Sequence, residues 1–198
     1  LLFTSTAQRH HTRFTRWLMR QMDSVISTCK AAADYLKIPP DKLIPHGIDT
    51  VRYQPAIGPV ALPADLVAPA QHYIGIFGRV RAQKGVDVLV TAALPILAHH
   101  TDWALIIVGE IKPEEQPFVN DLKQQAERAG VLDRVVFTGP RPFEELPRLF
   151  ACMSIVTALS RNEGFGLTVL EAMSSAKAVI ASRAGAWPDI LTPEEDGL

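Results

Sequence analysis

Hydrophobic and polar positions follow two different patterns along the chain, and the change comes near residue 71. Beyond it, short apolar runs rich in β-branched residues predict buried strands at His72–Phe77, Trp103–Val108, Arg134–Phe137, Ser154–Leu159 and Ala178–Ala181. Stretches with helical spacing separate them, at Val86–His99, Glu114–Ala129, Phe143–Ala151 and Leu167–Ser175. Alternating strands and helices predict an α/β fold in which a Rossmann-like parallel sheet carries helices on both faces.

Residues 1–71 follow a less regular pattern. The pattern predicts a basic helix within residues 8–22, a strand at Ser24–Thr28, a small helix at Ala31–Leu36 and a strand leading into a turn at Leu43–Asp49. From Gln54 to Ala70 prolines are frequent and charges are few, which is typical of a linker. We therefore predict an incomplete domain at residues 1–53, an interdomain linker at 54–71 and a second domain at 72–198.

Composition narrows the classes of function. The chain has 20 basic and 21 acidic residues, a balance that does not favour nucleic-acid binding. Cys29 and Cys152 form no Cys-x-x-Cys motif, so we expect neither a disulfide framework nor a zinc site, and a reducing, cytoplasmic location fits. No apolar run has the length of a transmembrane helix. Because the sequence begins without methionine and stops abruptly at Leu198, we expect a piece of a longer protein, truncated at the C-terminal end of its second domain.

The segment from Arg161 to Met173 holds the richest candidate chemistry. Glu163 and Glu171 flank a Gly-Phe-Gly turn between a predicted strand and a predicted helix. This order places free backbone N–H groups and the positive end of a helix dipole at the loop, where an anion such as a diphosphate is stabilised. Glu171 lies among apolar residues, so it either faces solvent across the helix or belongs to a site. Glu163 and the two glycines favour a site.

A second glycine-bearing loop, Gly78–Gly85, follows the first strand of this domain. Arg79 and Lys84 could hold a phosphate pair there, since charge-assisted hydrogen bonds are worth about 1.5–3 kcal/mol each. The alternative is a solvated basic turn. Further glycines follow the other strands, at Gly109, Gly139 and Gly164. Ligands of open parallel sheets bind at the carboxyl ends of the strands, so we expect these glycines to surround one site.

Other motifs exclude some functions or keep two interpretations. The order of residues 78–85 is not that of a Walker A loop, and Gly164-Phe165-Gly166 lacks the third glycine of a dinucleotide fingerprint. His46 is either catalytic or structural, and Arg141 either stacks on a base or lies at the surface. No Asp-x-Asp motif is present and the paired histidines have no ligands at metal-binding spacing, so no metal site is expected.

The basic helix expected near the N-terminus also has two interpretations. Arg9, Arg13, Arg16 and Arg20 recur at the spacing of one helix face, while Phe14, Trp17 and Leu18 supply apolar surface. The helix is either an ordinary amphipathic one with a solvated arginine face or, through residues 9–20, a surface for an anionic acceptor or for membrane headgroups.

Together these motifs resemble a known family. Glu163-x7-Glu171, in the context Glu-Gly-Phe-Gly-Leu-Thr-x-Leu-Glu-Ala-Met, is similar to the signature of the family 4 retaining glycosyltransferases, which adopt the two-domain GT-B fold. Gly78-Arg79-x4-Lys84-Gly85 and His46-Gly47-Ile48-Asp49 match further landmarks of that family. The likeness covers about residues 23–198, and the branch looks like bacterial lipopolysaccharide-core mannosyltransferases. It implies that residues 72–198 are the donor-binding C-terminal half of a GT-B fold and that residues 1–53 are a remnant of the acceptor-binding half.

The resemblance implies roles for the motif residues. Glu171 would bind the ribose of a nucleotide sugar and Glu163 the hydroxyls of its sugar, while Arg79 and Lys84 would bind the diphosphate and stabilise its growing charge. The residues expected to line the donor through their backbone or to flank its base are Gly78, Gly109, Gly139, Arg141, Gly164, Phe165, Gly166, Leu167 and Thr168. The family needs no metal or other cofactor. Ala176 departs from the pattern, because the family usually has glycine there.

The resemblance therefore predicts a retaining, metal-independent glycosyltransferase that transfers a hexose, with mannose from GDP-mannose favoured, to a glycan or lipopolysaccharide-core acceptor. Alternatives are a UDP-hexose-dependent enzyme of the same fold, a sugar-nucleotide epimerase of the same shape, and a non-catalytic nucleotide-sugar-binding module. The intact motif residues argue against the last. Since little of the acceptor half is present, we expect this piece to bind donor without transferring it. We expect a cytoplasmic protein, with residues 9–20 as the candidate contact to the inner membrane.

Overall fold

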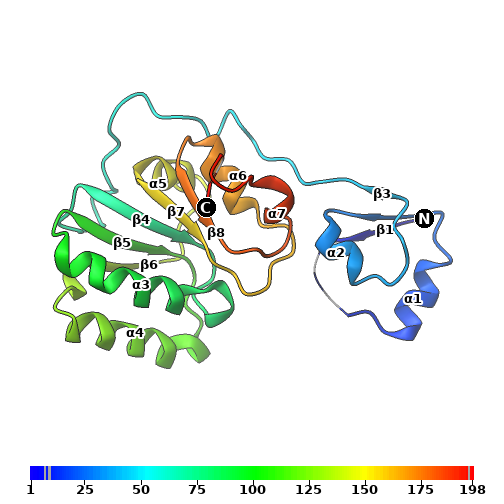
Figure 1. Ribbon diagram of the computed structural model, residues 1–198, viewed down its shortest axis with the longest axis horizontal. Helices are drawn as coiled ribbons and strands as arrows, with labels where there is room; N and C mark the ends of the chain where they lie inside the picture. The colour runs from blue at the N-terminus through cyan, green and yellow to red at the C-terminus, as the bar shows by residue number, and fades with distance from the viewer. Residues whose placement is uncertain (7, 9, 196) are drawn as a thin grey trace.

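The computed structural model describes residues 1–198 except 7, 9 and 196. It contains two sheets, one of three strands in the order β1-β2-β3 and one of five strands in the order β6-β5-β4-β7-β8, and an extended segment connects them (Figure 1). Every neighbouring pair of strands is parallel. The predicted parallel α/β architecture is confirmed.

The five-stranded sheet forms within residues 72–198. Its strands are β4 (His72–Phe77), β5 (Trp103–Val108), β6 (Val135–Gly139), β7 (Ile155–Ala158) and β8 (Ala178–Ala181). Its helices are α3 (Val86–His99), α4 (Gln116–Arg128), α5 (Leu146–Cys152), α6 (Leu167–Ser174) and α7 (Trp187–Ile190). The predicted start of β6 at Arg134 was wrong, because Leu132–Arg134 forms a 3-10 turn. Helix α5 starts at Leu146 rather than Phe143, with a proline in its first turn, where the missing N–H costs no hydrogen bond.

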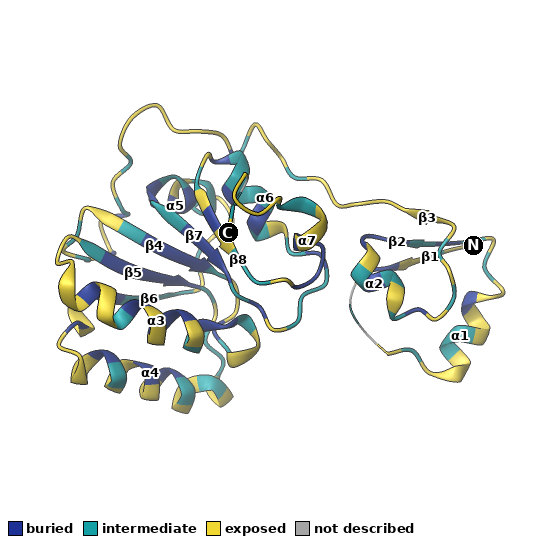
Figure 2. Cartoon of the chain, in the orientation of Figure 1, coloured by how far each residue is buried: buried dark blue, intermediate teal, exposed yellow. Residues whose placement is uncertain are grey.

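Both faces of this sheet are covered, as the alternation along β5 shows. Leu105 and Ile107 pack with residues of α3 and α4, whereas Ile106 and Val108 pack with residues of α5 and α6. Figure 1 shows these helix pairs on opposite sides of the sheet, and Figure 2 shows β5 buried along most of its length. A strand buried on both faces requires the continuous apolar run that the sequence has.

Residues 1–53 form the smaller sheet with little cover. The elements are β1 (Leu2–Ser5), α1 (Arg13–Met19), β2 (Ser24–Ser27), α2 (Lys30–Asp34) and β3 (Lys42–Leu43). Met19, Val25 and Leu36 form the buried centre of this part. Sequence patterning missed β1 and extended the strand near Leu43 too far, since only two residues of β3 pair with β2. No described helix in either part is long and apolar enough to cross a lipid bilayer.

Residues 54–71, called the strap below, contain no helix or strand but pack on the second domain. Leu66 is buried in its main core, and Arg148 of α5 donates a hydrogen bond to the carbonyl of Ala61 at 3.2 Å. Tyr53, just before the strap, is 2% exposed in the same core. Ser174 of α6 also donates to the Tyr53 carbonyl. The predicted linker therefore lies along α5 as part of the second domain's surface, and Tyr53 just before it contacts α6.

The smaller part also contacts the loop before α6. The Cys29 thiol donates to the Gly164 carbonyl at 3.4 Å, and Lys30 pairs with Asp189 at 3.0 Å. Phe165 packs in a cluster that includes Cys29, which caps α2, and residues of α2 itself. Residues 1–53 therefore lie against the loop that carries Glu163.

Candidate functional site

A cavity of about 300 Å³ opens at the carboxyl edge of the five-stranded sheet, where the loops after β4, β5 and β6 meet α6. Several predicted site residues line it: Gly78, Arg79, Gly109, Arg141, Thr168 and Glu171. The lining also includes residues that no motif indicated, namely Phe77, Val108, Glu110, Pro140, Leu146 and Phe150. Strand order explains the gathering, because β4, β5 and β6 are adjacent in the sheet and their loops leave the same edge side by side.

Close backbone contact makes one glycine essential to this edge. Gly109 has φ +156°, and a Cβ added there would lie 1.9 Å from the Gly78 carbonyl oxygen. The Gly109 N–H donates to the Gly139 carbonyl at 3.1 Å. Gly139 thus supports the wall from behind without lining the cavity. The two strand exits can meet this closely only without a side chain at residue 109.

Glu171 stands on α6 with its carboxyl partly buried, and burial raises its pKa. The nearby Tyr53 hydroxyl opposes that shift. This hydroxyl is buried without a well-formed hydrogen bond among the described residues, and burial together with the Glu171 charge raises the pKa of Tyr53 to about 12. The carboxylate therefore faces the cavity in front and a phenol behind, which suits it to accept hydrogen bonds from a ligand's hydroxyl groups.

The two arginines of the cavity differ in their partners. Arg79 is exposed and makes no hydrogen bond or ion pair within the described part of the chain. Arg141 is largely buried and pairs with Asp65 of the strap at 2.6 Å and with Glu145 at 3.5 Å. Arg79 is therefore available to an anion, whereas Arg141 is already neutralised and holds the strap beside the cavity.

Lys84 and Glu163 meet in an adjoining cleft that Thr168 shares with the cavity. Lys84 Nζ lies 2.5 Å from Glu163 Oε2, and both side chains are mostly buried. Ser160 Oγ donates to the same carboxylate oxygen at 3.1 Å, and the Gly164 N–H donates to Glu163 Oε1 at 3.1 Å. The serine was not predicted, although it stands only three residues before the glutamate. The Glu163 carboxylate thus accepts from three donors: Lys84, Ser160 and the Gly164 N–H.

The remaining predicted residues lie outside both openings. The Phe165 side chain is buried among Cys29, Ala32 and Ala186, with the His46 ring edge-on to it at 5.1 Å. Gly166 caps α6, and its carbonyl accepts a hydrogen bond from Trp187. Gly164 and Leu167 do not line the cavity or the cleft either. Phe165 is buried and Gly164 and Gly166 have no side chain, so any contact of these three with a ligand comes from their backbone.

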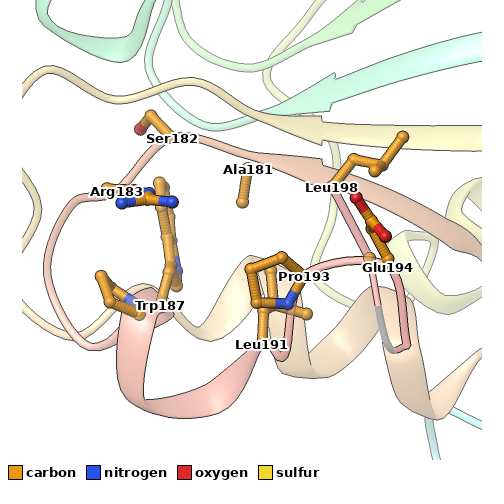
Figure 3. A pocket seen from close by; sticks show the side chains of 10 residues that line it. Ala181, Ser182, Arg183, Trp187, Leu191, Pro193, Glu194 and Leu198 are labelled. Carbon is orange, nitrogen blue, oxygen red and sulfur yellow. The ribbon is translucent and has the colours of Figure 1, made fainter.

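Two other hollows are lined by different sets of residues. One of about 380 Å³ lies beside α7, with Trp187, Arg183 and Glu194 in its wall (Figure 3). It contains none of the predicted site residues, so volume alone does not locate the site. The second, of about 400 Å³, is lined by Arg13, Arg16, Arg20 and Lys37. Arg9, predicted to belong to the same face, lies outside the described residues. No three metal-ligating side chains gather within the described residues.

Comparison with known proteins decides the family. The family model of the glycosyl transferases group 1 matches residues 71–198, which hold the five-stranded sheet and the cavity. The chain belongs to this family. In this glycosyl transferase the region that matches the family model includes both signature carboxylates, Glu163 and Glu171.

Individual relatives agree with that assignment. This glycosyl transferase is 42% identical over 200 residues to the lipopolysaccharide core biosynthesis mannosyltransferase LpcC of Rhizobium leguminosarum bv. viciae, covering 100% of this chain and 55% of the relative. The C-terminal domain of a glycosyl transferase group 1 family protein (LpcC) from Francisella tularensis superposes with a TM-score of 0.71 at 38% identity, over 76% of this chain and 78% of that one. Anabaena HepE in complex with UDP superposes with a TM-score of 0.80 at 26% identity, over 100% of this chain and 57% of HepE.

Two expectations from the sequence are thereby confirmed. The chain is similar to lipopolysaccharide-core mannosyltransferases, and its fold is that of the C-terminal half of the GT-B glycosyltransferases. The chain spans about half the length of the curated relatives it matches.

Proposed function

We propose that this chain is the donor-binding part of a retaining mannosyltransferase that uses GDP-mannose and glycosylates a lipopolysaccharide-core acceptor. The observation that carries the proposal is the continuity of the cavity that holds Arg79 and Glu171 with the cleft that holds Lys84 and Glu163, through Thr168. A nucleotide sugar needs such a site, because its ribose, diphosphate and hexose lie in a row. The relatives named as lipopolysaccharide core mannosyltransferases support the donor sugar and the acceptor.

Each charged residue has a place in this proposal. Glu171 accepts hydrogen bonds from the ribose, and unpaired Arg79 binds the diphosphate. Lys84 leaves Glu163 for a phosphate oxygen when the donor enters, which frees the Glu163 carboxylate for the sugar hydroxyls. As the glycosidic bond breaks, negative charge grows on the diphosphate, and the two cations stabilise it in place of a metal ion.

The donor is tested by thermal shift with GDP-mannose, UDP-glucose and ADP-glucose. A ligand that binds only the native state at a hundred times its dissociation constant stabilises it by about 2.7 kcal/mol, so GDP-mannose should raise the melting temperature most. A larger shift with UDP-glucose would favour the alternative UDP-hexose transferase, to which the likeness to UDP-bound HepE points. No shift with any nucleotide sugar would contradict the proposal.

The two carboxylates are separated by calorimetry. Glu171→Gln should lower the affinities for GDP and for GDP-mannose by the same factor, because the ribose is common to both ligands. Glu163→Gln should leave GDP binding nearly unchanged and weaken only GDP-mannose. Equal losses for both ligands in both variants would contradict the separate roles.

We also propose that this chain alone binds donor but transfers nothing, since the acceptor must be positioned at the donor's anomeric carbon. The chain and the full-length enzyme are incubated with labelled GDP-mannose and a lipopolysaccharide-core acceptor. Transfer by the chain at a rate close to that of the full-length enzyme would show that residues 1–198 suffice. A non-catalytic binding module would give no transfer with either protein.

The hollow lined by Arg13, Arg16, Arg20 and Lys37 supports a membrane contact of the same enzyme. No ion pair within the described residues neutralises Arg13, Arg16, Arg20 or Lys37. On the same helix the side chains of Phe14 and Trp17 are exposed and stacked with ring centroids 5.9 Å apart. Cations beside exposed aromatic side chains fit the interface of an anionic bilayer.

Vesicle binding tests this surface. The full-length enzyme should bind vesicles that contain phosphatidylglycerol, and binding should fade as salt is added. Charge reversal at Arg13 and Arg16 should abolish it, whereas reversal of two exposed cations of α4, Lys123 and Arg128, should not. Equal binding by both double variants would return α1 to a plain amphipathic helix.

A further inference from the structure

The loops that carry Lys84 and Glu163 belong to different strand–helix units, yet their backbones are in contact. Gly85 ends the turn that holds Lys84, and Leu159 precedes the loop that holds Glu163. A Cβ added to Gly85 would lie 2.1 Å from the Leu159 carbonyl oxygen, and the φ of Gly85 is +73°. The two loops therefore approach as closely as main chains can.

Arg161 fastens these loops together. Its backbone N–H donates to the Gln83 carbonyl at 2.8 Å, and its guanidinium donates to the Ala82 carbonyl. The same guanidinium donates to Asp87 Oδ1 at 2.8 Å and Oδ2 at 2.7 Å. Asp87 stands in the first turn of α3, where the helix dipole also favours its negative charge. The Arg161–Asp87 clamp thus joins the loop after β7 to the turn that contains Lys84 and to the first turn of α3, which follows it.

Geometry, rather than stability, is the contribution of this clamp. The side chains of Arg161 and Asp87 are 49% and 33% exposed, and exposed ion pairs contribute about 0–1 kcal/mol. A bidentate pair nevertheless fixes both distance and orientation, because the guanidinium and the carboxylate are planar. Lysine cannot reproduce this, since its ammonium has no such fork.

We infer that Arg161 and Asp87 are positioning residues of the donor site, which hold Lys84 and Glu163 at the separation where both contact one diphosphate sugar. The inference rests on the proposed function and assigns a role to residues that contact no donor themselves. Lys84 Nζ and Glu163 Oε2 are 2.5 Å apart, and in the proposed complex the donor separates them. With the clamp in place, only the two side chains need to move. Without it, the loops drift and the contacts to the sugar end of the donor weaken.

Affinity measurements on this chain test the role. In Arg161→Gln and Asp87→Asn, GDP affinity should fall by no more than about twofold, because Lys84 is its one misplaced contact while Glu171 and Arg79 remain. GDP-mannose affinity should fall about tenfold, because the contacts of both Lys84 and Glu163 are then misplaced. Arg161→Lys should resemble Arg161→Gln. Arg128→Gln on α4 is the matched control and should change neither affinity. Equal losses for GDP and GDP-mannose, or no loss for GDP-mannose, would overturn the inference.

Hydrogen exchange without ligand reads the clamp separately. Peptides that cover residues 82–88 and 159–164 should exchange faster in Arg161→Gln, while peptides of α4 should not change. Unchanged exchange at both loops would show that the pair holds nothing and would overturn the inference whatever the affinities are. A wild-type chain that binds no nucleotide sugar would contradict the proposed function. In that case faster exchange in Arg161→Gln would show that the clamp holds the loops together, but its role in positioning a donor would be overturned.

Discussion

The two sheets of this molecule are both parallel, but only one of them is a self-supporting core. Residues 72–198 sandwich β5 between two helix layers, and its side chains from Ala104 to Val108 are buried. In residues 1–53 the sheet has a two-residue edge strand, and its buried centre consists of Met19, Val25 and Leu36. The candidate site is therefore built in the part whose backbone is fixed by burial on both faces of the sheet, whereas the smaller part depends on contacts such as those with Phe165.

The largest expected difference concerns glycine. Gly109→Ala should lower the free energy of unfolding by about 3 kcal/mol or more, because the new Cβ meets the Gly78 backbone and the φ is unfavourable. At Gly47 nothing lies within 4 Å of an added Cβ, so Gly47→Ala should change the value by less than about 0.5 kcal/mol. Urea denaturation checks both. Similar losses would erase the contrast between the two parts.

Arginines give the next largest contrast. Arg134 is 8% exposed and donates to the carbonyls of Leu97 at 2.5 Å and His100 at 3.0 Å, where α3 ends. Arg134→Gln should cost about 2–3 kcal/mol of unfolding free energy, as carbonyls there lose a charged donor. Arg20→Gln on exposed α1 should cost less than about 0.5 kcal/mol. An equally mild effect at Arg134 would show that water replaces the lost donor.

Glu171 should trade stability for binding. Burial raises the pKa of Glu171 in the folded state, so stability falls as the pH rises from the ordinary carboxyl pKa to the raised one, and the whole loss is present above it. Glu171→Gln should therefore raise the melting temperature at neutral pH, and the gain should shrink as the pH falls through the raised pKa and vanish below the ordinary carboxyl pKa. The same variant should lower GDP affinity about tenfold, which corresponds to the loss of one charged hydrogen bond.

The matched control for this trade is Glu127→Gln, at an exposed position of α4. It should change neither the melting temperature nor GDP affinity. Loss of stability at neutral pH in Glu171→Gln, with the control unchanged, would mean that the carboxylate is held by hydrogen bonds that outweigh its burial.

The smallest expected effect compares two strained residues. Ala176 after α6 and Lys37 in the smaller part have φ of +54° and +55°. Because glycine adopts this conformation without steric cost, Ala176→Gly should stabilise the second domain by about 0.5–1 kcal/mol. Lys37→Gly should leave that domain's unfolding midpoint unchanged. If Lys37→Gly raised the same midpoint equally, the two parts would unfold as one unit.

Sequence patterning predicted the second domain well, because its signals are local. The bounds of β4, β5, β8 and α3 match the prediction, since their apolar runs end at glycine or polar residues. The missed elements lack such signals. Of the four residues of β1 only Ser5 is buried, and α7 is a single turn that packs through Trp187. Pairing with other elements, rather than propensity, forms both.

The same limit applies to the site. The sequence made Glu163, Glu171, Arg79 and Lys84 candidates because they stand in or beside glycine-bearing loops after predicted strands, with a solvated helix face and a solvated basic turn as the alternatives. It could not predict that Tyr53 lies behind Glu171 or that Asp65 neutralises Arg141, because both come from a stretch without periodicity. Whether Arg141 contacts a base stays a prediction. Loops that are fixed only by tertiary contacts have no hydrophobic periodicity in their own sequence, so their positions cannot be predicted from it.

The strap sets an order of events during synthesis. The strap carbonyl of Ala61 and the carbonyl of Tyr53, just before the strap, accept from Arg148 and Ser174 at sequence separations of 87 and 121 residues. When the strap leaves the ribosome, those donors do not yet exist, and closing such long loops carries an entropic cost that shorter contacts avoid. We expect the strap to dock only after α6 has formed. For the same reason it should detach first when the folded chain is stressed, which makes it the segment where limited proteolysis would cut earliest.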